Sequence, residues 1–151
     1  MKLNSIDKVL DFAIEKEQDA ADFYTDLAGR MKKKNMKEIF EQFALEEKSH
    51  KAKLQQVKSG KLDLSPVNQK IMDLKIAETM PEIDPASEFD YQQALIVAMN
   101  NEKASYRLYT DLAGMIDDPG VKQFFLGLAQ EEAKHKLRFE IAYDDDILVE
   151  N

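Results

Sequence analysis

The stretch EKASYRLYTDLAG at residues 102–114 is followed by EEAKH at residues 131–135. Both patterns occur once before in the chain, at a constant offset of 85 residues. The polar residues repeated in this way are Glu17 and Glu102, Tyr24 and Tyr109, Glu47 and Glu132, and His50 and His135. The chain is therefore a two-fold internal repeat, and its two histidines occupy equivalent places.

The residues around these motifs have the periodicity of helices, because apolar side chains recur at intervals of three and four. The pattern predicts helices over about 6–31, from 35 to about 59, from 87 to about 116, and from 119 to about 143. The expected helix starts and stops are Ser5, Asn35 with Glu38, Gly60, Ser87, and Asp118 before Pro119.

These helices predict an all-α protein with a single domain over residues 1–151, built from repeat halves 5–60 and 87–143. The connecting residues 61–86 contain prolines and have no counterpart in the repeat. A crossover of that length can return the chain along the whole bundle, so that the third helix runs parallel to the second. We expect an antiparallel four-helix bundle with one long crossover and a loose acidic tail at residues 144–151.

The composition excludes several classes of function. The absence of cysteine excludes disulfides, thiolate metal sites and a cysteine nucleophile, so any metal would be held by oxygen and imidazole. A net charge of -8 argues against binding to nucleic acid or to anionic membranes. The sequence has neither a membrane span nor the apolar core of a signal peptide, and we expect a cytoplasmic protein.

Six repeated polar residues fall within the apolar stripes of the four helices and are predicted to point into one core. They are Glu17, Glu47, His50, Glu102, Glu132 and His135. Each buried carboxylate would cost on the order of several kcal/mol unless it were compensated, and a whole domain is stable by only about 5–15 kcal/mol. No Lys or Arg is expected on the inward faces near these residues. Two divalent metals would balance four carboxylates, with the imidazoles as neutral ligands.

Two other interpretations of the motif remain open. A Glu-x-x-His pair on a helix can be a solvated surface pair, and a duplicated site can have decayed, leaving its carboxylates protonated or hydrated. Glu46 and Glu131 point about 100° away from the neighbouring glutamates, which favours a solvated surface position for both. Tyr24 and Tyr109 follow Glu17 and Glu102 on the same helix faces. They either pack in the core or donate a hydrogen bond to a ligand carboxylate of an adjacent helix.

In combination, these motifs and the long crossover resemble the rubrerythrin family of the ferritin-like superfamily. The resemblance implies a ferritin-like bundle with two iron ions, or manganese or a mixed pair, in which Glu47 and Glu132 bridge the metals. It also implies one terminal glutamate and one histidine for each metal. The expected activity is the oxidation of Fe(II) with reduction of hydrogen peroxide or dioxygen. The alternative is a protein that binds, handles or stores iron without catalysis.

Two departures from the rubrerythrin pattern shape these expectations. Rubrerythrins carry a rubredoxin domain with four cysteines, and because this sequence has no cysteine we expect an external, rubredoxin-like electron donor. They also carry another carboxylate one turn after the glutamate of the third helix, where this chain has Ser105. The resulting set of four glutamates and two histidines is closer to the ferroxidase centre of bacterioferritins, which leaves the oxidant open. The family resemblance also implies a homodimer.

Overall fold

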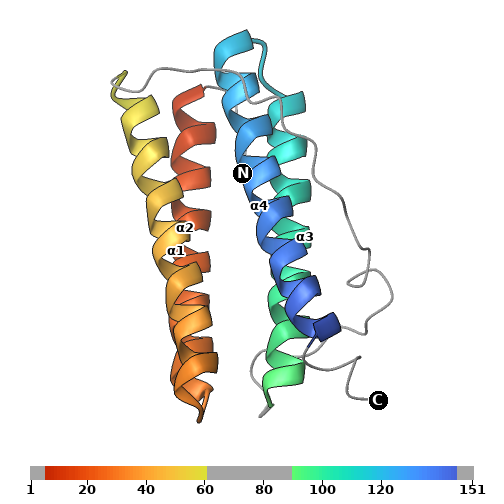
Figure 1. Cartoon of the computed structure of the whole chain (residues 1–151). Helices are drawn as coiled ribbons and strands as arrows, with labels where there is room; N and C mark the ends of the chain where they lie inside the picture. Colours follow the sequence, from red (N-terminus) through yellow and green to blue (C-terminus); the bar gives the residue numbers. More distant parts are fainter. Residues whose placement is uncertain (1–5, 61–89, 146–151) are drawn as a thin grey trace.

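The four predicted helices are present in the computed structural model, which describes residues 6–60 and 90–145 (Figure 1). Their bounds are α1 Ile6–Arg30, α2 Lys34–Lys58, α3 Tyr91–Gly114 and α4 Pro119–Tyr143, and these residues contain no strand. The all-α class is thereby confirmed. None of the described helices has the length and apolar character needed to cross a membrane. Ser5, the expected crossover 61–86 and residues 146–151 lie outside the described residues.

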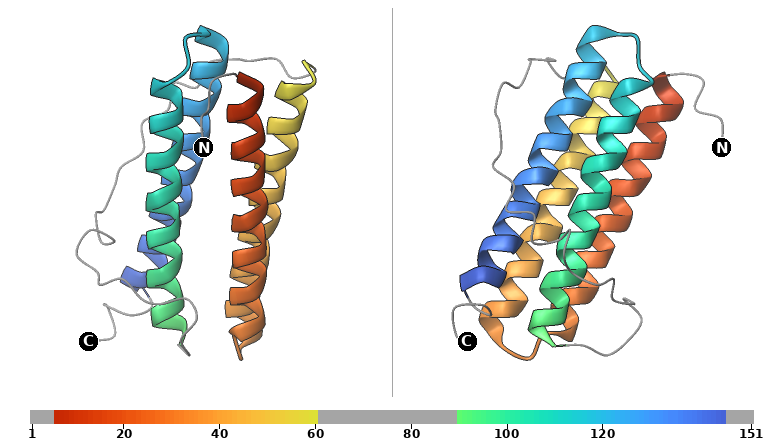
Figure 2. Two further views of the ribbon diagram at one scale, coloured as in Figure 1. Left: turned by 180° about the vertical axis from the view of Figure 1, so that it is seen from behind. Right: turned by 90° about the vertical axis from the view of Figure 1, so that its right-hand side faces the viewer.

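The helices form two antiparallel hairpins, α1 with α2 and α3 with α4, which lie side by side (Figure 2). In Figure 1 the colours of α2 and α3 progress in the same direction, so these two helices are parallel across the long connection. This arrangement confirms the predicted four-helix bundle, and the connection between α2 and α3 lies outside the described residues. It also places each half of the sequence repeat in one hairpin, with the inward faces of the hairpins opposed.

Among the described residues, one predicted helix start is confirmed and one is wrong. The side chain of Asp118 accepts a hydrogen bond from the Val121 amide at 3.0 Å, before a first-turn proline, as predicted. The predicted cap at Asn35 is wrong, because α2 has already begun at Lys34 and residue 35 lies within the first turn. The expected cap at Ser87 lies outside the described residues. The described part of α3 begins at Tyr91, where Asp90 forms a reciprocal capping box with Gln93.

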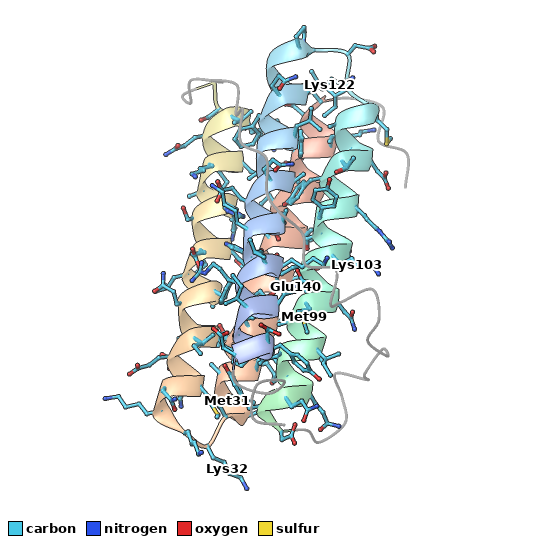
Figure 3. The ribbon with its side chains drawn as sticks, turned by 45° about the vertical axis from the view of Figure 1, so that its right-hand side comes forward. Met31, Lys32, Met99, Lys103, Lys122 and Glu140 are labelled. Carbon is cyan, nitrogen blue, oxygen red and sulfur yellow. The ribbon has the colours of Figure 1, made fainter. Side chains whose placement is uncertain are left out.

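The apolar core consists of two clusters, one toward each end of the bundle. The cluster near the α1–α2 turn is rich in aromatic rings that pack against one another, namely those of Tyr24, Phe40, Phe43 and Phe139. The cluster near the α3–α4 turn is mainly aliphatic and includes Leu10, Leu54, Leu112, Phe125 and Leu128. Lys32 and Lys122 mark these opposite ends in Figure 3. The six polar residues of the repeat come from the middle of the helices, between the two clusters.

Candidate metal centre

All six predicted ligand residues are buried in the interior, with 0–4% of their surface exposed. Their side-chain atoms form two groups, and within each group the potential ligand atoms lie within 4.8 Å of one another. One group consists of Glu17, Glu47, His50 and Glu132, and the other consists of Glu47, Glu102, Glu132 and His135. Every helix contributes to the cluster, and Glu47 and Glu132 belong to both groups.

The two imidazoles contact glutamates of the opposite hairpin. The Nδ1 atom of His50 lies 2.9 Å from Glu132 Oε1, and the Nδ1 atom of His135 lies 3.0 Å from Glu47 Oε1. The two rings are nearly parallel, with an interplanar angle of 4° and centroids 5.5 Å apart. The cluster therefore has an approximate two-fold symmetry that matches the sequence repeat, and neither hairpin forms a complete group by itself.

The two repeated tyrosines are also exchanged between the hairpins. The buried Tyr24 hydroxyl on α1 donates to Glu102 on α3, and the Tyr109 hydroxyl on α3 donates to Glu17 on α1. These are the hydrogen bonds to carboxylates of another helix that the sequence favoured. Each phenol occupies one oxygen of its glutamate and leaves the other oxygen available.

Most of the remaining side-chain polar atoms in the cluster have no hydrogen-bond partner. They are Glu17 Oε2, both oxygens of Glu47, His50 Nδ1, Glu102 Oε2, both oxygens of Glu132, and His135 Nδ1. Buried polar atoms are ordinarily paired, so such a concentration requires a further partner. Within residues 6–60 and 90–145, no Lys or Arg forms an ion pair with these four glutamates. The donor set of oxygens and imidazole nitrogens without sulfur fits a pair of divalent iron or manganese ions.

Burial and mutual repulsion perturb the ionisation of the cluster. Burial, followed by the charge of Glu102, raises the pKa of both Glu47 and Glu132 well above the ordinary value of a glutamate. Burial lowers the pKa of His135, but contacts with Glu102, Glu46 and Glu47 outweigh that effect and raise it to about 12. The protein without metal therefore retains protons in this cluster. Metal ions that bind there would displace them.

The tyrosines remain protonated for a related reason. Burial, reinforced by the charges of nearby glutamates, raises the pKa of Tyr24 and of Tyr109 well above 10.0. Both phenols therefore act as hydrogen-bond donors at any pH near neutrality. Their positions fix the orientation of the carboxylates of Glu102 and Glu17.

Sequence reasoning placed Glu46 at a solvated surface, and the structure corrects this position. Both oxygens of Glu46 accept hydrogen bonds from Arg138 Nη1 at 2.9 Å, and its Oε1 lies 3.8 Å from His135 Nε2. Only 31% of its side-chain surface is exposed. Its partner comes from a different helix, so no spacing within one helix could have indicated the contact. Glu131 is partly exposed and pairs with Lys134 of its own helix.

Sequence reasoning also missed a buried cation. Lys136 and Glu140 on α4 are both buried and lie 3.7 Å apart, a pair that the sequence did not predict. The apolar stripe of α4 did not reveal them because this helix is buried over more than one stripe.

Comparisons with known proteins agree with this geometry. The sequence model of the rubrerythrin family matches residues 8–143. Among solved structures, a hypothetical protein from Pyrococcus furiosus is similar, with a TM-score of 0.65 and 26% sequence identity. That similarity covers 93% of this chain and 89% of the archaeal one. No curated protein matches the sequence.

Proposed function

Since this chain belongs to the rubrerythrin family, we propose that it is a di-iron redox protein that oxidises Fe(II) while reducing hydrogen peroxide or dioxygen. One observation carries the proposal: two overlapping groups of buried glutamates and histidines, in which most of the side-chain polar atoms have no hydrogen-bond partner. Four carboxylates carry a charge that two divalent ions balance. This balance would offset the desolvation cost of four buried, charged carboxylates.

The arrangement of the groups supports distinct roles for the ligands. Glu47 and Glu132 occur in both groups and would bridge the two metals. Glu17 and His50 would complete one position, and Glu102 with His135 would complete the other. His50 and His135 reach the cluster because each lies three residues after a bridging glutamate, on the same helix face.

The protein's contribution to the reaction is to hold the ligands and exclude water. When bound, a pair of ferrous ions supplies two electrons, which with two protons convert one hydrogen peroxide to two waters, or one dioxygen to one hydrogen peroxide. Tyr24 and Tyr109 keep their phenolic protons and hold one oxygen each of Glu102 and Glu17. The aromatic and aliphatic clusters on either side of the site restrict access of bulk water.

Stopped-flow mixing tests this function directly. The protein is loaded anaerobically with two equivalents of Fe(II) and mixed separately with hydrogen peroxide and with oxygenated buffer. We expect oxidation with at least one oxidant to be faster than for free Fe(II), and the faster reaction identifies the oxidant. The matched control is Glu47→Ala with Glu132→Ala, which removes both bridging carboxylates. Rates equal to those of free Fe(II) with both oxidants would refute the proposal.

A further inference from the structure

The surroundings of the two histidines differ, although the sequence repeat makes their positions equivalent. Both rings face the four glutamates through Nδ1. Behind the rings, the two repeat halves carry different side chains. The difference concerns residues that are not among the six proposed ligands.

On the side of His135 that faces away from the four glutamates, the neighbouring side chains contact one another as well as the ring. The Nε2 atom of the ring faces Glu46 Oε1 at 3.8 Å, and a movement of about 1 Å would bring this contact to hydrogen-bond length. Arg138 holds Glu46 through two hydrogen bonds at 2.9 Å. The Arg138 guanidinium lies 4.4 Å from the centre of the Phe43 ring, and that ring packs edge-on against the imidazole of His135. The carboxylate is therefore fixed in position beside the outer nitrogen of His135.

The equivalent set in the other half of the repeat is absent. At the offset of 85 residues, the counterparts are Glu131, His50 and Lys53. Glu131 pairs with Lys134 at 3.3 Å, and among the described residues it forms no ion pair with His50. Lys53 is exposed, and within the described part of the chain it forms no ion pair with Glu131. Thus the outer carboxylate is held against only one of the two histidines.

The two tyrosines also differ in their hydrogen bonds, and the additional bond is again in the group that contains His135. The Asn101 side chain donates to the Tyr24 hydroxyl at 3.2 Å, and Tyr24 in turn donates to Glu102. The counterpart of Asn101 is Lys16, an exposed residue that makes no hydrogen bond to Tyr109 within the described part of the chain. Both additional interactions therefore support the group that contains His135 and Glu102.

We infer that Glu46, anchored by Arg138, is a positioning residue that makes the two metal positions unequal, so that the position at His135 binds divalent metal more tightly than the position at His50. A carboxylate behind a ligand imidazole fixes the orientation of the ring and increases its basicity, and loss of such a partner weakens metal binding by about 10–100-fold. The inference rests on the proposed metal centre. It predicts that metal fills the position at His135 before the position at His50.

Anaerobic titration of the full-length, metal-free protein with Co(II) tests the order of filling without any redox reaction. Visible absorption and calorimetry are expected to resolve two steps of one equivalent each, with affinities about tenfold or more apart. His135→Ala should abolish the tighter step, whereas His50→Ala should abolish the weaker one. Binding in a single step with equal affinities would overturn the inference and leave the proposed metal centre intact.

Glu46→Gln isolates the positioning role. We expect it to weaken the tighter step by about tenfold or more and to shift the visible band of the first Co(II) bound. Glu131→Gln is the matched control, because it removes the same charge from the equivalent place in the repeat, and it should change neither step. Equal effects of the two variants would overturn the inference, since they would show a general effect of charge.

A second pair of variants tests the anchor and substitutes for Glu46→Gln if that protein does not fold. Arg138→Met should weaken the tighter step selectively, and Lys53→Met, its counterpart in the repeat, should leave both steps unchanged. Circular dichroism verifies that each variant is helical before titration. If the wild-type protein bound no Co(II), Mn(II) or Fe(II), both the proposed function and this inference would be wrong.

Discussion

At the residue scale, the tyrosines show how the site is held together. Tyr24 and Tyr109 are fully or almost fully buried, and each hydroxyl donates to a glutamate of the other hairpin. A phenol satisfies a carboxylate oxygen without adding charge, and it leaves the second oxygen free to bind metal. The two hydrogen bonds also join α1 to α3 at the centre of the bundle.

Replacement of either tyrosine by phenylalanine should therefore destabilise the metal-free protein. Tyr24→Phe and Tyr109→Phe each leave a buried carboxylate oxygen without a donor, which costs about 1–3 kcal/mol. Urea unfolding followed by circular dichroism measures the change. Tyr106→Phe is the control, because that side chain is at the surface and its loss should change stability by less than about 0.5 kcal/mol. If all three variants unfolded alike, the hydrogen bonds would contribute nothing to stability.

At the element scale, the helix ends set the register that brings the ligands together. Asp90 and Asp118 cap α3 and α4 with their side chains, whereas Lys33, the residue before α2, makes no side-chain cap. At the other end of α2, Gly60 has a φ of 74°, a left-handed conformation that side chains disfavour. The end of α2 thus depends on a glycine, in agreement with the predicted helix stop.

Glycine substitutions should change stability in opposite directions at two helix ends. Gly60→Ala places a Cβ in the left-handed region and should destabilise the protein by about 1–2 kcal/mol. Gly114→Ala, in the last turn of α3, meets no atom within 4 Å and should stabilise it by about 0.4–1 kcal/mol through the unfolded state. Gly29→Ala is the equivalent of Gly114→Ala in the repeat and serves as its replicate. Thermal unfolding of the three variants gives the comparison, and a stabilising Gly60→Ala would contradict the assignment of the cap.

At the scale of the whole molecule, the two hairpins together bury the ionisable side chains of the site. The raised pKa values of Glu47 and Glu132 mean that the folded, metal-free protein holds protons that the unfolded chain releases above about pH 4.5. His135 acts in the same direction between pH 6.5 and about 12. Glu46 acts oppositely, because the contact with His135 and the hydrogen bonds from Arg138 lower its pKa from 4.5 to about 2.

The metal-free protein should therefore lose stability as pH rises. Protonated Glu47, Glu132 and His135 stabilise the folded state at low pH, and this stabilisation declines through their raised folded-state pKa values. The contribution of Glu46 is present above pH 4.5 and is lost below it. We expect the highest melting temperature near pH 4.5 and a decline above it that becomes steeper above pH 6.5, where His135 adds to the effect of the two glutamates.

Added metal should reverse that decline. Metal binds the deprotonated ligands of the folded state, so its stabilising effect grows with pH. Melting curves at pH 5.5, 7 and 8.5, with Mn(II) and with a chelator, provide the measurement. Glu47→Gln with Glu132→Gln should flatten the pH dependence of the metal-free protein and remove the response to Mn(II). A wild-type melting temperature that rises with pH in chelator would contradict the ionisation described here.

The sequence by itself determined the helices, the bundle and the six polar residues of its centre, because helical periodicity is a local property and the repeat shows it twice. Only the tertiary structure decided which residues meet between helices. Tyr24 reaches Glu102 across 78 residues, and Glu46 meets Arg138 across 92. Such contacts depend on how helices pack, which spacing within one helix does not specify. The equivalence of the two histidines is therefore a property of the sequence, and their different surroundings are a property of the fold.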